Sequence, residues 1–273
     1  TYPPDQVEYL IVDNKSTDGT GESLQAAIVA FQREGLVLHS AIESTIQSSY
    51  AARNRGIRLA KGTILAFTDA DCRPDRHWLA HLIEPFTDPT IDVVVGEIAG
   101  LPSQNWLENY AEQKQVLSQK YTLEHPFCPY GQTANLAVKR SLFVEVGLFR
   151  PYLTTGGDAD FCWRALKDNA HRYVFVPQAL VLHRHRSNLK ELAQQWQRYG
   201  RSNRYLHDLH GVDLMVKPQL SYQLYLLTRW LIREVPALLL AILTRKLTAR
   251  LFLSRVLSTP LSIYCNYNRF QGQ

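Results

Sequence analysis

Residues 63–75, Thr-Ile-Leu-Ala-Phe-Thr-Asp-Ala-Asp-Cys-Arg-Pro-Asp, contain the pattern that decides the fold class. The apolar run at residues 64–67 is typical of a buried parallel strand. Asp69 and Asp71 follow this run one residue apart, and Pro74 stands where a helix can begin. We therefore expect both carboxylates at the carboxyl end of a strand, which is where open α/β sheets bind ligands.

We expect no local cation to pair with the carboxylates of Asp69 and Asp71. Carboxylates gathered at a strand end suggest a Mg²⁺ or Mn²⁺ ion that holds a phosphorylated substrate. The alternative is an Asp-rich surface turn, because aspartate is a favoured turn and cap residue. The segments described below bear on whether Asp69 and Asp71 form a metal site or a surface turn.

Strand-like and helix-like segments alternate through the first half of the chain. This alternation implies βαβ units and a mostly parallel sheet flanked by helices. Predicted strands cover residues 7–12, 36–39, 63–67, 91–97, 134–139, 173–176 and 180–182, and predicted helices cover 21–33, 48–60, 75–86, 106–120, 160–167 and 189–209.

The chain has 273 residues, 45% of them hydrophobic, which allows one large domain or a domain with an appendage. After residue 188 the pattern changes to long amphipathic helices, so we predict a first domain at 1–210 and a helical tail at 211–273.

The net charge of +5 is modest, and we expect no nucleic-acid partner. The basic excess belongs to the tail, where residues 214–273 contain eight Lys/Arg and one acid, Glu234.

The four cysteines are scattered without CxxC spacing, which argues against a disulfide framework or a zinc site and favours reduced cytosolic thiols.

The longest uncharged apolar stretch of the tail, residues 235–243, is shorter than the ~20 residues that span a bilayer. We predict no transmembrane helix. The chain opens on Thr1 and reaches a strand almost at once, so we expect a fragment that lacks its first strand and helix.

Two further segments offer donor-binding candidates. Asp13 follows the first apolar run and precedes a Ser/Thr/Asp/Gly loop, where it could accept an N–H hydrogen bond from a nucleobase or simply belong to a capped loop. The helix at 48–60 carries several arginines and leads directly into the strand before Asp69. One of them, with Arg53 as our candidate, could reach a diphosphate, although basic residues usually form a solvated helix face.

A second acidic cluster, Gly156-Gly-Asp-Ala-Asp160, stands before a helix. We expect Asp160 to cap that helix and Asp158 to be the candidate general base, near a metal without ligating it. Further on, His183 and His185 close a strand. A lone histidine is more often a packing residue than a ligand, but His183, next to the apolar run, is the better candidate for a metal.

These segments, in this order, resemble glycosyltransferase family 2, whose members have the GT-A fold, a Rossmann-like nucleotide-diphospho-sugar transferase fold. The resemblance covers roughly residues 1–205. Its matching segments are VDNKSTDGT (12–20), ARNRGIRLAKG (52–62), FTDADCRPD (67–75), GQTANLAVKRSLFVEVGLF (131–149), GGDADFCWR (156–164), VPQALVLHRH (176–185) and QWQRY (195–199).

The resemblance implies a role for each matched residue. Asp13 would recognise the base, Asp71 would bind the metal directly, and Asp69 would contact the ribose or the metal's water shell. Asp158 would be the catalytic base and His183 would complete the metal site. At the Arg position of the family's QxxRW element, Arg198 would contact the donor diphosphate or the acceptor.

The chain departs from the family pattern in three places. The opening strand and its nucleoside-binding loop are absent, so we expect the chain by itself to be inactive or impaired. Gly157 stands where the family has the Glu of a Glu-Asp pair, and Tyr199 replaces the Trp of QxxRW. We therefore infer no processive polymerase.

The predicted activity is an inverting, metal-assisted transfer of a hexose-like sugar from a nucleotide-diphosphate donor to a carbohydrate or lipid-linked acceptor, in polysaccharide or glycolipid synthesis. One alternative is a nucleotide-sugar-binding module without turnover. Another is a haloacid-dehalogenase-type phosphatase with Asp69 as nucleophile, for which we find no convincing downstream Lys and acidic pair.

Aromatic and aliphatic residues alternate with Arg and Lys in the tail segments 222–243 and 247–264. Helices of this type can lie in a membrane interface with their basic face toward anionic headgroups. The alternative is a helical pair that packs on the catalytic domain. We predict peripheral attachment at the cytoplasmic face of the cell membrane.

Overall fold

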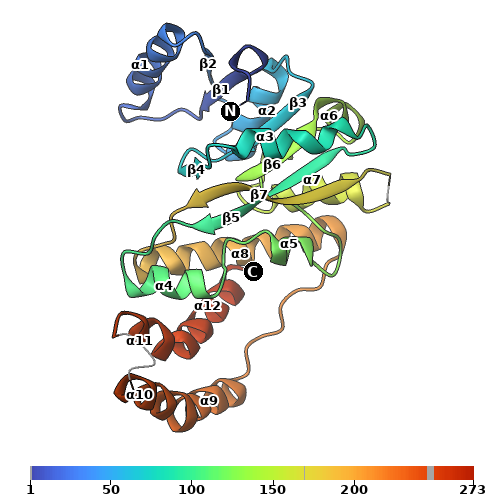
Figure 1. Cartoon of the computed structure of the whole chain (residues 1–273). Helices are drawn as coiled ribbons and strands as arrows, with labels where there is room; N and C mark the ends of the chain where they lie inside the picture. Colours follow the sequence, from blue (N-terminus) through green and yellow to red (C-terminus); the bar gives the residue numbers. More distant parts are fainter. Residues whose placement is uncertain (1, 169, 245–248) are drawn as a thin grey trace. The chain divides into compact units, whose positions relative to one another are not determined.

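The computed structural model describes residues 2–168, 170–244 and 249–273, which form two compact units (Figure 1). The sheet unit consists of Thr1–Ile98 and Ser118–Leu182, and the helical unit of Ala99–Leu117 and His183–Gln273. The domain boundary near residue 210 stays a prediction. Arg245 and Lys246, counted above among the basic residues of the tail, and the start of the segment at 247–264 lie outside the described residues.

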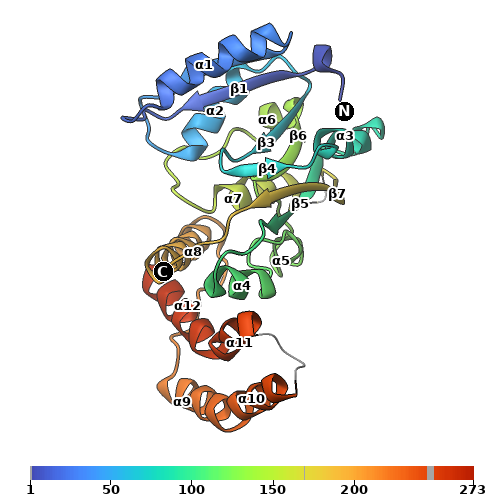
Figure 2. The same cartoon turned by 60° about the vertical axis from the view of Figure 1, so that its left-hand side comes forward.

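The first part of the sheet unit is a parallel pair of strands, β1 (Glu8–Asp13) and β2 (Val37–Ile42). Helices α1 (Thr20–Arg33) and α2 (Ser49–Leu59) pack on this pair (Figure 2). Ser48 caps α2 by accepting a hydrogen bond from the Ala51 N–H at 3.1 Å. The buried side chain of Asn54 exchanges hydrogen bonds with the backbone of Phe149, so one polar residue of this helix faces the core.

A five-stranded sheet follows, in the order β3 (Ile64–Thr68), β6 (Asn135–Lys139), β5 (Val93–Gly100), β7 (Tyr173–His183) and β4 (Cys72–Pro74). The α/β class predicted from the sequence is confirmed. The pairing differs in one respect from a mostly parallel sheet, since β6 runs antiparallel to both β3 and β5. Hydrophobic periodicity predicts that a segment is a strand but carries no information on its direction.

Pro74 does not begin a helix, contrary to the prediction. It is the last residue of β4, and the N–H of Asp75 donates to the carbonyl of Leu180 at 2.9 Å, which keeps the chain extended. Helix α3 therefore begins later (Trp78–Ile83) and continues into a 3-10 turn (Glu84–Thr87).

The prediction of a single helix at 106–120 is also wrong. This segment forms two helices, α4 (Trp106–Gln113) and α5 (Lys120–Leu123), because Gln115 between them adopts a left-handed conformation with φ 49°. The two strands predicted at 173–176 and 180–182 form one strand, β7, that runs through Pro177.

The remaining helices of the sheet unit are α6 (Arg140–Glu145) and α7 (Gly157–Leu166). An aromatic core holds α7 in place: Phe161 stacks on Phe143 with ring centroids 4.6 Å apart and contacts Phe149 at 4.9 Å. Phe67 of β3 meets Phe149 edge-on at 5.9 Å. The strand before the acidic pair and the helix that carries the second acidic cluster therefore share one core.

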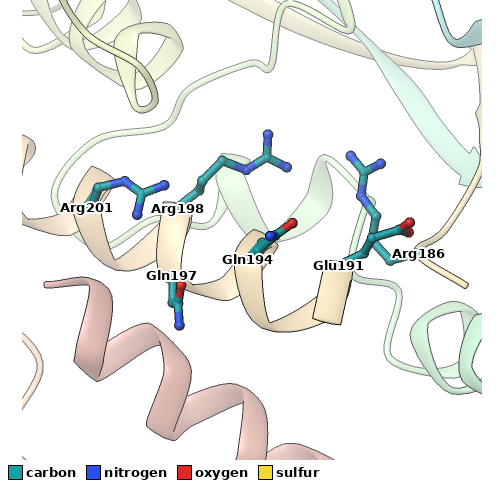
Figure 3. A pocket seen from close by; sticks show the side chains of 6 residues that line it. All are labelled: Arg186, Glu191, Gln194, Gln197, Arg198 and Arg201. Carbon is teal, nitrogen blue, oxygen red and sulfur yellow. The ribbon is translucent and has the colours of Figure 1, made fainter. Parts of the chain in front are cut away.

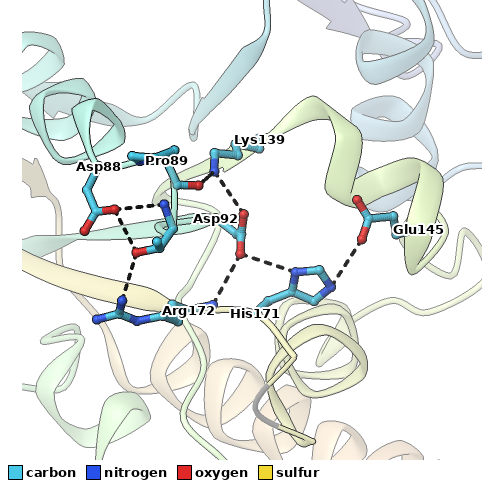
Figure 4. Close-up of polar contacts among 8 residues, drawn as sticks. Asp88, Pro89, Asp92, Lys139, Glu145, His171 and Arg172 are labelled. Carbon is cyan, nitrogen blue, oxygen red and sulfur yellow. Dashed lines mark hydrogen bonds and ion pairs between the residues drawn. The ribbon is translucent and has the colours of Figure 1, made fainter.

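Polar contacts join the ends of three strands around Asp92 (Figure 4). Its carboxylate lies 3.1 Å from Lys139 Nζ at the end of β6 and 3.3 Å from His171 Nδ1, shortly before β7. The backbone N–H groups of Asp92 and Val93 both donate to the carbonyl of Arg172. Because these contacts bridge β5, β6 and β7, they set the register of the central strands.

In the helical unit, α8 (Leu189–His210) packs on α12 (Ser258–Gly272), and α11 (Ala249–Val256) packs on α4. Helix α9 (Leu220–Arg229) continues through a π-helical turn (Trp230–Glu234) into α10 (Val235–Leu243). Within the part of the chain that the structure describes, no helix combines the length and the apolar composition needed to cross a membrane.

The crossing of α8 and α12 depends on two glycines. A Cβ on Gly200 would overlap the carbonyl oxygen of Arg269, and a Cβ on Gly272 would overlap that of Gln197. Since both obstacles are backbone atoms, no rotamer change can relieve them.

We expect Gly200→Ala to destabilise the protein by about 1–3 kcal/mol, the usual cost of overpacking, despite the better helix propensity of alanine. The matched control is Gly21→Ala in α1, where an added Cβ meets nothing within 4 Å and should be neutral or slightly stabilising. Thermal and urea unfolding measure both. Equal stability of Gly200→Ala and the wild type would contradict the close crossing.

Candidate active site

Arg53 and Asp69 form an ion pair at the end of β3. The Arg53 guanidinium, on α2, donates from Nη2 to Asp69 Oδ1 at 2.6 Å, and its side chain is 17% exposed. The expectation of no local cation beside the acidic pair is corrected. The cation comes from a helix that precedes β3, and only the fold brings it to the strand end.

Asp158 lies in the first turn of α7, where Gly156 at φ 76° lets the chain turn into the helix. Its Oδ1 accepts a hydrogen bond from the hydroxyl of Thr133 at 2.9 Å. Burial raises the pKa of Asp158, and the charge of Asp69 adds to the effect, whereas Arg53 and the Thr133 hydrogen bond oppose it. The result is a carboxylate that binds a proton more readily than an ordinary aspartate.

Arg53 stays charged between the two carboxylates. Burial acts to lower its pKa, but the charges of Asp158 and Asp69 outweigh burial and raise it. The guanidinium also lies over the ring of Tyr50, 5.4 Å from the centroid. One cation therefore interacts with both acids and with an aromatic face.

Tyr50 explains why position 157 is a glycine. A Cβ on Gly157 would lie 2.7–2.8 Å from atoms of the Tyr50 ring, so the ring fills the space that a side chain would need. Tyr50 is buried, and burial followed by the charge of Asp158 raises the pKa of its hydroxyl, which stays protonated. The ring of a tyrosine from α2 thus occupies the space that an acidic side chain at position 157 would need.

Asp13 is the last residue of β1, and its carboxylate closes the loop that follows. Oδ1 accepts hydrogen bonds from the N–H of Ser16 at 3.1 Å and from its hydroxyl at 2.5 Å. Asn14 anchors the same loop by donating to the carbonyls of Glu43 and Ile46, both at 2.9 Å. The loop is therefore well supported, and base recognition by Asp13 stays a prediction.

Of the two predicted metal ligands, Asp71 is exposed between β3 and β4, and His183 is the last residue of β7. Asp71 belongs to the sheet unit and His183 to the helical unit, so their joint ligation stays a prediction. Next to Asp71, burial raises the pKa of the Cys72 thiol to about 11, with the charges of Asp69 and Asp71 adding to it. Cys72 is therefore protonated at neutral pH.

Asp160 does not cap α7, contrary to the prediction. Its side chain is fully buried and pairs with Arg150 Nε at 3.1 Å and Arg164 Nε at 3.2 Å. Its own N–H already donates to the carbonyl of Gly156, so it stands inside the helix and its side chain faces the core. A sequence cannot distinguish this role from capping, because both place an aspartate near a helix start.

Arg198 lies on α8 in the helical unit, where six side chains line a pocket of about 470 Å³ (Figure 3). The opposite face of α8 is apolar: Trp196 packs on the cluster that contains Leu192 and Leu261. The hydroxyl of Tyr199 accepts a hydrogen bond from Gln195 Nε2 at 3.0 Å. The lining residues are Arg186, Glu191, Gln194, Gln197, Arg198 and Arg201.

Sequence reasoning missed two residues of the site, Tyr50 and Thr133. Thr133 lies in the quoted segment 131–149 and carries a hydroxyl that could have been singled out. Tyr50 gave no signal, since its contact with Gly157 joins positions more than a hundred residues apart.

The comparisons with known proteins match this chain to glycosyltransferases. The family model described as glycosyl transferase family 2 matches residues 2–147. Glycosyltransferase AglE of Haloferax volcanii is 31% identical over 191 residues, which cover 67% of this chain. The chain spans 58% of the length of that relative.

Two solved structures are similar in fold. A mannosyltransferase from Pyrobaculum calidifontis, in complex with GDP-Man and Mn²⁺, superposes with a TM-score of 0.59 at 20% identity, covering 99% of this chain and 76% of its own. GalNAc-T7 with UDP, GalNAc and Mn²⁺ gives a TM-score of 0.52 at 21% identity, covering 68% of this chain and 39% of its own. These likenesses confirm the predicted GT-A fold.

The opposite environments of Asp158 and Asp160 predict opposite effects of the same substitution. Asp158→Asn should raise the Tm at neutral pH, because the folded state then no longer holds a desolvated carboxylate whose pKa is raised. This gain in Tm should shrink as the pH falls through the pKa that Asp158 has in the folded protein. Below that pKa the wild-type Asp158 is protonated and uncharged, like the asparagine of the variant.

Asp160→Asn is the matched control on the same helix. It breaks two buried ion pairs and should cost about 3 kcal/mol or more. Thermal unfolding across pH compares the variants, and a lower Tm for Asp158→Asn at neutral pH would contradict the raised pKa.

Proposed function

The chain belongs to glycosyl transferase family 2, and we propose that it moves a sugar from a nucleotide-diphosphate donor to an acceptor hydroxyl, with inversion and with the help of a divalent cation. The observation that carries the proposal is the cluster of Arg53, Asp69 and Asp158 in the sheet unit, with its shared electrostatics. A protonatable carboxylate beside a fixed cation is suited to proton transfer next to a phosphate-bearing substrate.

Asp158 would act as the general base. Its carboxylate accepts the proton of the acceptor hydroxyl while the acceptor oxygen bonds to the anomeric carbon. The bond from that carbon to the donor phosphate oxygen breaks, and the nucleoside diphosphate leaves with the bonding electrons. A single displacement from the opposite face inverts the anomeric centre. The raised pKa supports this role, because a base works best when its pKa is near the operating pH.

Asp71 and His183 would hold the ion, which would supply positive charge to the departing diphosphate. The Asp71 carboxylate is a suitable ligand for Mg²⁺ or Mn²⁺, and the His183 imidazole suits Mn²⁺ better than the harder Mg²⁺, so the donor set fits Mn²⁺ best. Asp69 is engaged by Arg53, which supports a contact with the ribose or with the water shell of the ion. The likeness to structures solved with Mn²⁺ also supports a divalent cation.

The donor would be bound by Asp13 at the base and by Arg53 and Arg198 at the diphosphate. A guanidinium has five N–H donors, so Arg53 can keep its bond to Asp69 and still bind a phosphate oxygen. GDP-mannose and UDP-N-acetylgalactosamine are the donor probes that the similar structures suggest. The acceptor would be a carbohydrate or a lipid-linked molecule.

Peripheral attachment to an anionic membrane surface is the second part of the proposal. Helix α10 and the π-helical turn before it expose large apolar side chains, among them Leu231 at 60% in the turn and Leu240 at 62% and Leu243 at 80% in α10. Arg229 and Arg233 lie on the same helical segment. Apolar residues interleaved with arginines are suited to the boundary between headgroups and acyl chains.

In the full-length protein, Asp71→Ala and Asp158→Asn should each abolish sugar transfer, but for different reasons. Only Asp71→Ala should also weaken donor binding in the presence of Mn²⁺, because Asp158 acts on the acceptor. Radiolabelled transfer and donor calorimetry with and without Mn²⁺ separate the two effects. Turnover that survives in either variant would overturn the corresponding role. A full-length protein that binds donor without turnover would instead be a nucleotide-sugar-binding module.

Flotation with vesicles tests the membrane part. The chain should float with anionic vesicles at low salt and remain behind with zwitterionic ones. The double change Leu240→Ser and Leu243→Ser should reduce flotation, because it removes apolar area from α10. The control is Val144→Ser, an equally exposed apolar residue of α6 at 85% exposure. A wild-type chain that stays at the bottom of the gradient with anionic vesicles would rule out the attachment.

A further inference from the structure

The pocket on α8 gathers three arginines from two segments. Arg186 comes from the segment after β7, whereas Arg198 and Arg201 lie one turn apart on α8. Figure 3 shows the side chains of Arg198 and Arg201 on the same side of the helix. All three line the same hollow of about 470 Å³. A solvated basic helix face would not need a second segment or a cavity.

No described residue forms a hydrogen bond or an ion pair with these three guanidinium groups. Other arginines of the helical unit are paired: Arg184 with Glu108 at 3.6 Å, Arg204 with Asp208 at 3.2 Å, Arg229 with Glu234 at 2.9 Å and Arg269 with Asn203 at 2.9 Å. The three pocket arginines are thus among the cations of the helical unit that have no hydrogen-bond or ion-pair partner within the described residues.

The charge of the pocket calls for an anion. Among the described residues that line the pocket, Glu191 is the one acid, so three cations face a single carboxylate. Like charges held close together repel each other, and a ligand with several negative oxygens would remove that repulsion. Guanidinium groups match phosphate oxygens with paired N–H donors.

The helix that carries the pocket is fixed against α12. Gln197 donates from Nε2 to Asn268 Oδ1 of α12 at 3.0 Å, and Gly200 meets the same helix closely. Arg198 and Arg201 therefore project from a backbone that is already held in place. Preorganised donors bind a charged ligand at a lower entropic cost than donors on a mobile loop.

We propose that Arg186, Arg198 and Arg201 form a binding pocket for a phosphate group. The assignment of its source rests on the proposed function: the group belongs either to the donor diphosphate or to an acceptor that carries a phosphate. The pocket adds Arg186 and Arg201 to the residues that recognise substrate. Binding depends on ionic strength, because partly exposed charges are screened by salt.

Calorimetry of the whole chain with pyrophosphate at low ionic strength tests the pocket. Arg186→Gln and Arg201→Gln should each weaken binding about tenfold or more, since each removes charge-assisted hydrogen bonds. The matched control is Arg204→Gln on the same helix, outside the lining, which should bind as the wild type does. Pyrophosphate should also raise the wild-type Tm, a measurement that needs no variant.

Two further probes distinguish whether the bound phosphate group belongs to the donor or to the acceptor. If the phosphate is that of the donor, GDP or UDP should lose affinity in both variants. If it is that of the acceptor, nucleotide binding should persist, and dihexanoyl phosphatidic acid, a water-soluble lipid phosphate, should lose affinity instead. Either result supports the pocket.

The proposal is overturned if Arg186→Gln and Arg201→Gln bind all these probes as the wild type does. It is also overturned if the wild type binds none of them at about 1 mM, a weak affinity for a specific site. Because these measurements read binding rather than turnover, they can fail while sugar transfer succeeds, and the reverse.

Discussion

The attraction between one buried cation and two carboxylates organises the sheet unit around its candidate site. Arg53 from α2 pairs with Asp69 at the end of β3 and interacts with Asp158 at the start of α7. Burial makes the charges of Arg53 and Asp158 costly, and their mutual attraction offsets part of that cost. The three elements that carry them are consequently held at one place by the same groups that would do chemistry there.

The sequence predicted most elements of the sheet unit because their patterns are local. Residues 64–67 read as a strand, and the glycines before α7 marked a helix start. Pro74 misled the prediction, since its extended conformation depends on pairing between its neighbour Asp75 and β7. The direction of β6 and the left-handed turn at Gln115 likewise follow from packing rather than from local pattern.

For the site, the sequence identified acidic residues but not what surrounds them. Asp69, Asp71 and Asp158 were found through spacing and through the family pattern, both of which are read along the chain. The partner of Asp69, the ring beside Gly157 and the two arginines on Asp160 are contacts across the fold. Two aspartates two residues apart can therefore have opposite effects on stability, although their local sequence looks alike.

The contact between Tyr50 and Gly157 also constrains how this lineage can change. A side chain introduced at position 157 would collide with the ring unless Tyr50 shifted, so an acidic residue beside Asp158 is disfavoured while Tyr50 keeps its place. Replacing Tyr50 by a smaller residue would make room, but it would also remove the aromatic face under Arg53. We therefore expect the effects of substitutions at the two positions to depend on each other, so that their order matters for folding.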